Sequence, residues 1–126
     1  MILLDTNYLI GALIDGSDAA SRILTWLERG ETLATSAICW YEFLSGPVNG
    51  HHERTMVAAL RGGILPFSDP EAQEAAALFN RTKRTQRLRV DAMIAATAII
   101  HQASLATHNR DDFVLFTRHG LKLTPR

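Results

Sequence analysis

Short apolar runs alternate along the chain with longer segments in which apolar residues recur every three or four positions. The runs have the length of strands buried on both faces, and the periodic segments are typical of helices with one buried face. Strands that alternate with helices predict a parallel sheet covered by helices on both sides. We therefore predict an α/β fold, a three-layer α/β/α domain with a central parallel sheet of four to five strands. The strands are expected at residues 2–4, 32–35, 64–67 and 105–107, with 121–124 as a fifth, edge strand.

Capping side chains and helix breakers place the helices between these strands. Ser36 can cap a helix that Gly46-Pro47 stops, and Ser68-Asp69-Pro70 combines a cap with proline at the first helical position. Asp91 opens an alanine-rich helix that is apolar nearly all round, so this helix should be buried against the sheet. Helices are expected at 8–14, from Ser17 or Asp18 to Gly30, at 37–45, at about 52–60, from Ser68 into the basic residues after Phe79, and from Asp91 onward.

Composition limits the class of protein. With 126 residues and 47% hydrophobic content, the chain suits one domain spanning residues 1–126. Thirteen Lys and Arg balance thirteen Asp and Glu, so nucleic-acid binding would require local basic patches. Cys39 is the only cysteine and lies in an apolar run, which suits a reducing cytoplasm. Residues 1–14 lack a secretory pattern and the apolar stretch 92–100 is too short to cross a bilayer, so we expect a cytoplasmic protein without membrane association.

Two aspartates lie where a parallel sheet exposes its ligand crevice. Ligands bind such sheets beyond the carboxyl ends of the strands, and Asp5 follows the first strand directly. Asp5 and Asp91 could each serve only as a helix cap. However, Thr6 or Asn7 could cap the first helix without Asp5. Asp91 could accept a backbone N–H with one oxygen while the other oxygen faces a cation.

Glu42 and a polar segment after the fourth strand supply further oxygens. Glu42 shares the apolar face of its helix with Ile38, so we expect it to be buried. A buried glutamate is normally paired or binds a metal. A solvated or salt-bridged Glu42 is the alternative. The segment 107–113 reads as a polar loop in which Asn109 and Asp112 could complete an acidic site, whereas Asp111 should face solvent. Carboxylates gathered in one cleft repel one another unless a hard cation such as Mg²⁺ or Mn²⁺ neutralises them, which suits phosphodiester hydrolysis.

Basic residues precede Asp91. Five of the nine residues from 81 to 89 are basic, and Lys83, Arg84 and Arg87 can share one helical face that contacts RNA phosphates, although most such runs are only solvated. The five histidines show no metal-ligand spacing. His51-His52 reads as a surface loop, and His108 could contact substrate without acting as the base.

Four blocks of sequence carry a resemblance when taken together: Leu4-Asp5-Thr6-Asn7, Trp40-Tyr41-Glu42-Phe43-Leu44, the run from Val90-Asp91 to Ala98, and the run from Leu105 to Phe113. In this order they resemble PIN-domain ribonucleases, specifically the VapC toxins of bacterial toxin–antitoxin pairs. The resemblance implies that Asp5, Glu42 and Asp91 form the acidic metal site, with Thr6 and Thr107 as polar groups beside the substrate. PIN domains often place an aspartate where this chain has Asn109, so a second metal would require Asp112 to turn inward.

The resemblance also implies an activity and partners. It implies endonucleolytic cleavage of structured RNA, often tRNA or rRNA, with Mg²⁺ or Mn²⁺ as cofactor. It further implies a homodimer and a small VapB-type antitoxin that blocks the acidic cleft and supplies the contacts to operator DNA. The RNA target, the antitoxin and the number of metal ions cannot be predicted from the sequence.

Two other functions remain open at this stage. A phosphatase could use Asp5 as a nucleophile after the first strand, but that chemistry usually needs a second acid two residues later, where Asn7 stands. A PIN-like binding or scaffold module could keep the sheet and the acids without cutting RNA.

Overall fold

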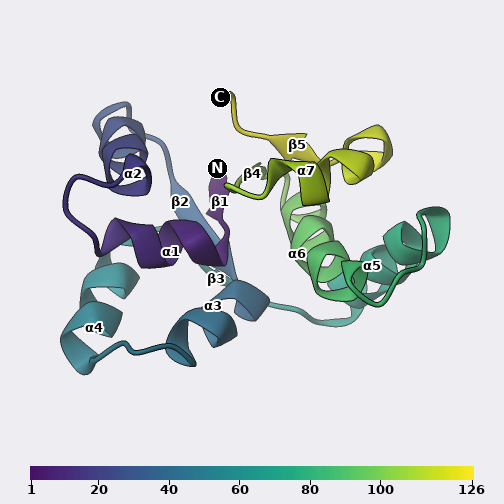
Figure 1. Cartoon of the computed structure of the whole chain (residues 1–126), viewed down its shortest axis with the longest axis horizontal. Helices are drawn as coiled ribbons and strands as arrows, with labels where there is room; N and C mark the ends of the chain where they lie inside the picture. Colours follow the sequence, from purple (N-terminus) through teal and green to yellow (C-terminus); the bar gives the residue numbers. More distant parts are fainter.

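A five-stranded, fully parallel sheet forms the centre of the computed structural model, which describes residues 1–126. The strand order is β3-β2-β1-β4-β5, so the first strand of the chain is the central one (Figure 1). This arrangement confirms the predicted fold class, and each strand lies within two residues of its expected position. The strands are β1 (Ile2–Leu4), β2 (Leu33–Ser36), β3 (Gly63–Leu65), β4 (Ser104–Ala106) and β5 (Lys122–Leu123).

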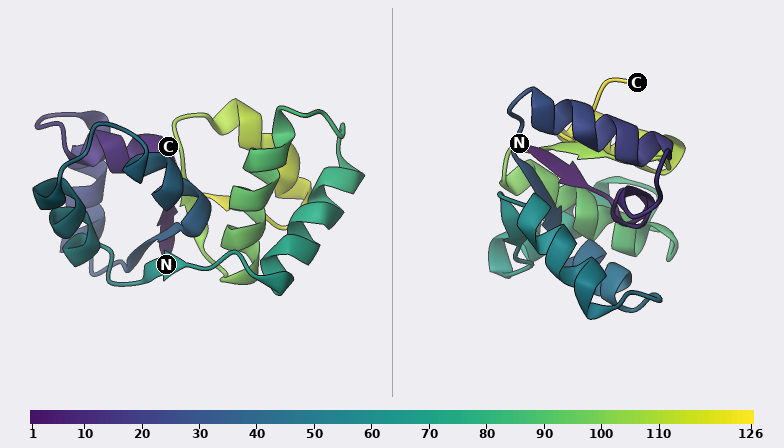
Figure 2. Two further views of the ribbon diagram at one scale, coloured as in Figure 1. Left: turned by 90° about the horizontal axis from the view of Figure 1, so that it is seen from below. Right: turned by 90° about the vertical axis from the view of Figure 1, so that its left-hand side faces the viewer.

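Helices cover the sheet on both sides. Figure 1 shows α1, α2 and α4 on one side of the strands and α5 and α6 on the other, and the left view of Figure 2 shows the same separation from below. The predicted caps at Ser17 and Ser36 are present at the starts of α2 and α3. Ser17 Oγ accepts the backbone N–H of Ala20, and Ser36 Oγ accepts the backbone N–H of Cys39. The helices are α1 (Thr6–Ala12), α2 (Asp18–Glu28), α3 (Ala37–Leu44), α4 (Gly50–Ala59), α5 (Asp69–Arg81), α6 (Leu88–Ile100) and α7 (Arg110–Phe113), followed by the 3₁₀ helix η1 (Val114–His119).

Small side chains bring the layers close together. Ala95, Ala96 and Ala98 of α6 are fully buried, as expected for the alanine-rich helix. Gly11 of α1 lies so close to α2 that an added Cβ would come within 2.7 Å of the Ala19 Cβ. A single cluster of 27 buried apolar residues joins the helices to the sheet. None of the helices combines the length and apolar character needed to span a membrane.

Three local predictions were wrong. Helix α6 begins at Leu88 and not at Asp91, because Leu88 is buried and anchors an additional turn. Asp91 therefore lies within the first turn, where it still faces the positive end of the helix dipole. The expected polar loop becomes α7 and η1 from residue 110 onward, since Phe113 and Phe116 are drawn into the core. His51-His52 belongs to α4 and not to a loop, and His52 completes the capping box of that helix.

Candidate functional site

Asp5 is fixed at the carboxyl end of the central strand by three elements. Its Oδ1 accepts the backbone N–H of Thr6 at 2.8 Å, which caps α1, and its Oδ2 accepts the hydroxyl of Thr107 at 2.7 Å. Its own N–H donates to the carbonyl of Ala106 at the end of β4. Only 5% of Asp5 is exposed. The capping role and the position at the ligand edge therefore belong to the same side chain.

Thr107 connects Asp5 to the segment after β4. Its hydroxyl donates to Asp5 and also accepts the backbone N–H of Asn109 at 3.0 Å. Asn109 precedes α7 as its N-cap residue, but its exposed side chain makes no capping hydrogen bond. The amide of Asn109 is thus available to contact a ligand, although the residue itself contributes no carboxylate.

Glu42 is exposed, and the prediction that it is buried was wrong. Helix α3 turns Cys39 and Phe43 into the core, which leaves Glu42 on the open side. Its Oε1 accepts the hydroxyl of Thr6 at 2.8 Å. Since Thr6 directly follows Asp5, this bond joins α3 to the end of the central strand and directs Glu42 toward the site from outside.

Asp91 carries the clearest electrostatic signature of the site. The pKa of Asp91 is raised to about 6, chiefly by burial and then by the negative charges of Asp112, Asp5 and Glu42, while Arg87 acts in the opposite direction. Each of these carboxylates therefore lies near enough to oppose the ionisation of Asp91. Asp5, Glu42 and Asp112 thus surround Asp91, and we call these four carboxylates the acidic cluster.

The basic segment before Asp91 does not form the single helical face that was predicted. Lys83 and Arg84 lie in the turn after α5, and Arg84 has a positive φ of 54°, so the three residues do not share a helical face. Arg84 instead lies over the ring of Phe79. Lys83 and Arg87 line a cavity of about 550 Å³ together with Asp112, and Arg87 forms an exposed ion pair of 3.6 Å with Asp112. Two of the three predicted phosphate contacts thus lie beside the acidic cluster.

A polar group around His108 was not predicted in detail. The His108 ring stacks on Tyr8 with centroids 4.4 Å apart, and its Nε2 lies 3.3 Å from Asp18 Oδ2. This hydrogen bond is the main cause that lowers the pKa of Asp18. His108 also lines a cavity of about 450 Å³ whose lining has no apolar residue and includes Asn109, Asp112 and the exposed Asp111. No local sequence pattern indicates that residues 18 and 108 lie together. They meet because α1 packs closely on α2.

The acidic cluster offers oxygen ligands without a complete cage. No three His, Cys, Asp or Glu side chains are arranged closely enough to hold a metal ion by themselves. Mg²⁺ in proteins usually takes one or two carboxylates and keeps several waters, so the carboxyl groups of Asp5 and Asp91 fit a partly hydrated Mg²⁺ or Mn²⁺. The Cys39 thiol lies 3.5 Å from Asp5, but burial raises its pKa to about 12, so it stays protonated and is no metal ligand.

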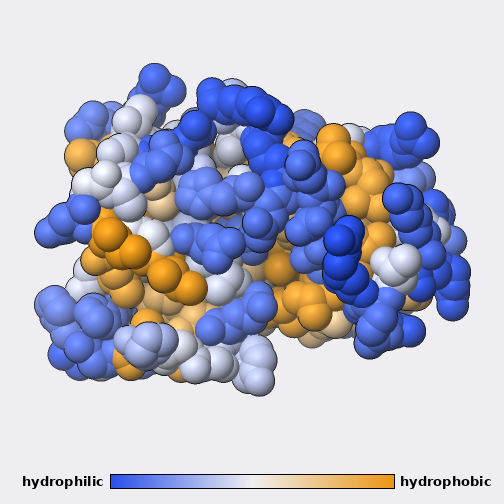
Figure 3. All heavy atoms as spheres, in the orientation of Figure 1, coloured by the Kyte–Doolittle hydropathy of each residue, from blue (hydrophilic) through white to orange (hydrophobic).

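The surface around the cluster is hydrophilic. Figure 3 shows hydrophilic residues gathered over the centre of the viewed face, between α1 and α7, with apolar atoms to either side. Such a surface suits a charged, extended ligand better than a small apolar one. The site is thus an open, acidic edge of the sheet flanked by a few basic side chains.

Comparisons with known proteins identify related chains. Residues 2–118 match the PIN domain family. Among solved structures, a chain of FitAcB from Neisseria gonorrhoeae is 27% identical with a TM-score of 0.74, and the match covers 99% of this chain and 97% of that chain. A toxin-antitoxin complex from Klebsiella pneumoniae contains a chain with 32% identity and a TM-score of 0.64, with 90% of both chains covered. The fold also matches VapBC2 from Rickettsia felis bound to a DNA fragment from their promoter, at 23% identity, a TM-score of 0.72 and 98% coverage of both chains. A search of curated proteins found no match.

Proposed function

Because the chain belongs to the PIN domain family, as its sequence predicted, we propose that it is a VapC-type toxin that hydrolyses RNA phosphodiester bonds with Mg²⁺ or Mn²⁺. The observation that carries this proposal is that burial, together with the negative charges of Asp112, Asp5 and Glu42, raises the pKa of Asp91 to about 6. Carboxylates that oppose one another's ionisation are stabilised by a bound cation.

Asp5 and Asp91 would hold the metal ion, and Glu42 and Asp112 would add negative charge beside it. A bound divalent ion would supply an activated water and offset the charge that grows on the phosphate. The hydrogen bond from Thr107 fixes the direction of the Asp5 carboxylate, and the hydroxyl of Thr6 fixes that of Glu42. Preorganised carboxylates of this kind do not need to reorient when the substrate binds.

Other side chains would act on water and RNA. The second carboxyl oxygen of Glu42 accepts no hydrogen bond from the protein and is open to solvent, so it can accept the proton of the attacking water. The amide of Asn109 can donate to a phosphate oxygen. Lys83 and Arg87, beside the cluster, can contact neighbouring phosphates without reading the sequence.

The proposed partner is a small VapB-type antitoxin that covers the acidic cluster. The similar chains from Neisseria and Klebsiella come from FitAcB and from a toxin-antitoxin complex, which supports a partner of this class. We further propose that the toxin is a cytoplasmic homodimer, that tRNA or rRNA is its substrate, and that it reaches operator DNA only through the antitoxin.

Cleavage of RNA by the purified protein tests the proposal. Wild type should cut tRNA or rRNA in Mg²⁺ and not in EDTA, and Asp5→Asn and Asp91→Asn should each lower the rate at least about 100-fold, because each removes a charge that holds the ion. Asp15→Asn removes a charge from the exposed turn after α1 and should cleave like wild type. Equal cleavage by Asp5→Asn and wild type would overturn the assignment of the active site.

The same experiment distinguishes the two alternatives. A scaffold module would leave RNA intact even when Mg²⁺ raises its melting temperature. A phosphatase would release phosphate from a small phosphomonoester, yet Asn7, in the position where that chemistry needs a second acid, is an exposed amide on α1. A map of new RNA ends after induction of the protein in cells would identify the substrate.

A further inference from the structure

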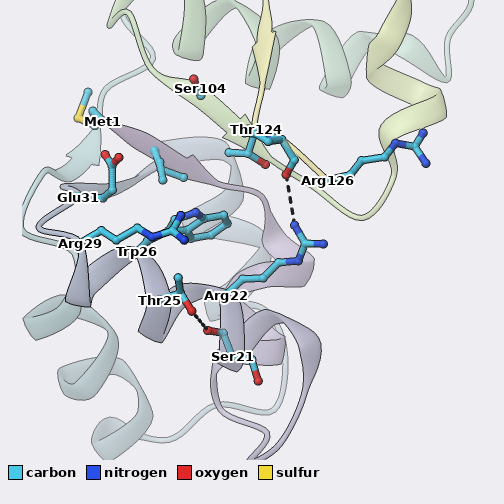
Figure 4. A pocket seen from close by; sticks show the side chains of 12 residues that line it. Met1, Ser21, Arg22, Thr25, Trp26, Arg29, Glu31, Ser104, Thr124 and Arg126 are labelled. Atoms are coloured by element: carbon cyan, nitrogen blue, oxygen red, sulfur yellow. Dashed lines mark hydrogen bonds between the residues drawn. The ribbon is translucent and has the colours of Figure 1, made fainter.

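A second polar cavity lies along α2, outside the acidic cluster. It encloses about 580 Å³ between α2, the start of β1, the start of β4 and the chain after β5 (Figure 4). Neither the predicted site nor the proposed mechanism uses any of its residues. We call it the α2 groove and define it by Arg22, Trp26, Arg29, Ser104, Thr124 and Arg126.

The α2 groove is positively charged. Three arginines line it, and Glu31 is the only carboxylate among its lining side chains. Arg29 and Arg126 form no salt bridge, whereas Arg22 binds Asp18 at 3.0 Å. Guanidinium groups with unused N–H donors bind phosphate oxygens strongly, often through two parallel hydrogen bonds. The groove therefore suits a ligand with phosphate groups.

An aromatic ring lies among these arginines. Trp26 is partly exposed, and Figure 4 shows its indole ring between Arg22 and Arg29. On its inner side the ring packs against Tyr8, with centroids 5.7 Å apart, which holds it in place. Proteins that bind single-stranded nucleic acid combine basic grooves with aromatic rings on which bases stack.

The α2 groove connects to the acidic cluster through shared residues. Arg126 lines both this groove and the polar cavity that contains Asn109 and Asp112. Asp18 makes a second connection, because it binds Arg22 on the groove side and His108 on the cavity side. A strand cut at the acidic cluster could thus continue past His108 into the groove.

We propose that the α2 groove binds the RNA strand beyond the cleavage position, with phosphates on Arg29 and Arg126 and a base against Trp26. This inference rests on the proposed function, since it assumes that RNA is the substrate. A free nucleotide offers the same chemistry as one residue of the strand, so the experiment must separate the two.

Binding of labelled single-stranded RNA to the Asp5→Asn protein tests the inference without cleavage. Fluorescence anisotropy should show that Arg29→Glu combined with Arg126→Glu weakens binding at least about 10-fold. The slope of the logarithm of the binding constant against the logarithm of the salt concentration should become shallower by about one for each phosphate contact that is lost. Arg54→Glu changes the charge of an exposed arginine on α4, outside both cavities, and should bind like the parent protein. Both groove arginines are exposed, so thermal melts should show unchanged folding.

A second measurement reports on Trp26 directly. The chain has two tryptophans, so Trp40→Phe leaves Trp26 as the only indole, and RNA should quench its fluorescence. Unquenched fluorescence at saturating RNA, or equal affinity of the parent and the double variant, would overturn the inference. Binding of uridine monophosphate as tight as that of a longer RNA would also overturn it and would identify a nucleotide site instead.

Failure of this inference and failure of the proposed function are distinguishable. If Asp5 is needed for cleavage but the arginine variants, made in the active protein, keep the wild-type KM, the groove does not bind the strand and the nuclease assignment stands. If the wild-type protein binds RNA through the groove but never cleaves it, the groove is confirmed and the nuclease assignment fails.

Discussion

Asp91 should destabilise the metal-free protein at neutral pH, and Asp91→Asn should relieve this. Asparagine has the size of aspartate but never ionises, so it removes the cost of burying a charge and, in addition, the repulsion from Asp112, Asp5 and Glu42. We therefore expect this substitution to increase the free energy of unfolding while it abolishes cleavage. Gains in stability from changes at functional residues follow from the cost of assembling such sites.

The magnitude follows from the pKa. The folded-state pKa of Asp91 is about 6, against about 4 in an unfolded chain, and two pKa units correspond to about 3 kcal/mol. Partial solvent exposure reduces the expected difference to about 1–2 kcal/mol. Because the folded pKa is raised, the protonated carboxyl favours folding below about pH 4, and this contribution is lost as the pH rises from about 4 to about 6. The two proteins should be equally stable near pH 4 and should diverge up to about pH 6.

Urea denaturation in EDTA at a series of pH values measures this difference. Taking the difference between variant and wild type cancels the titration of all other groups. Addition of Mg²⁺ at ten times its dissociation constant should then stabilise wild type at neutral pH by about 1.4 kcal/mol and should affect the variant much less. A difference that does not vary with pH, or a variant less stable than wild type at pH 7.5, would refute the raised pKa of Asp91.

Three further outcomes are expected. Thr107→Val should lower stability by about 1–3 kcal/mol and weaken Mg²⁺ binding, because the buried Asp5 loses its 2.7 Å hydrogen bond, whereas Thr107→Ser should retain both properties in the same melts. Gly11→Ala should cost about 1–3 kcal/mol in urea denaturation, since the new Cβ would lie 2.7 Å from that of Ala19 and force α1 away from α2; an unchanged midpoint would contradict this packing. The Cys39 thiol, fully buried with its pKa raised to about 12, should react with a thiol reagent at pH 8 only after unfolding, and rapid reaction of the native protein would show that the segment opens.

The strands were predictable because their signals are local. The apolar run of residues 2–4 and the caps at Ser17 and Ser36 act over a few residues, and the structure has these elements almost where expected. The start of α6 was misplaced because Asp91 resembles a cap, while the burial of Leu88 depends on neighbours that are distant in sequence. Residues 110–119 are helical for a similar reason, because burial of Phe113 and Phe116 in the core favours a helical backbone there.

The sequence could indicate which residues form the candidate site, but not how their side chains are oriented. Parallel strands bring Asp5 and the segment after β4 to one edge, which the order of elements alone indicates. The rotation of α3 could not be deduced, because an apolar helix with Glu42 on it is compatible with either a buried or an open carboxylate. The pairing of Asp18 with His108 needs the packing of α1 on α2, and no spacing in the sequence encodes it.

The central position of β1 has a consequence for protein synthesis. This strand is translated before the other four strands, yet its two neighbours are β2 and β4, and β4 is complete only at residue 106. Asp5 also lacks its hydrogen bond from the hydroxyl of Thr107 until that residue, 102 positions further along the chain, has been translated. A nascent chain that ends before residue 107 therefore lacks both β4 and the hydroxyl that orients Asp5, so the acidic edge of the sheet can form only after Thr107 has been translated.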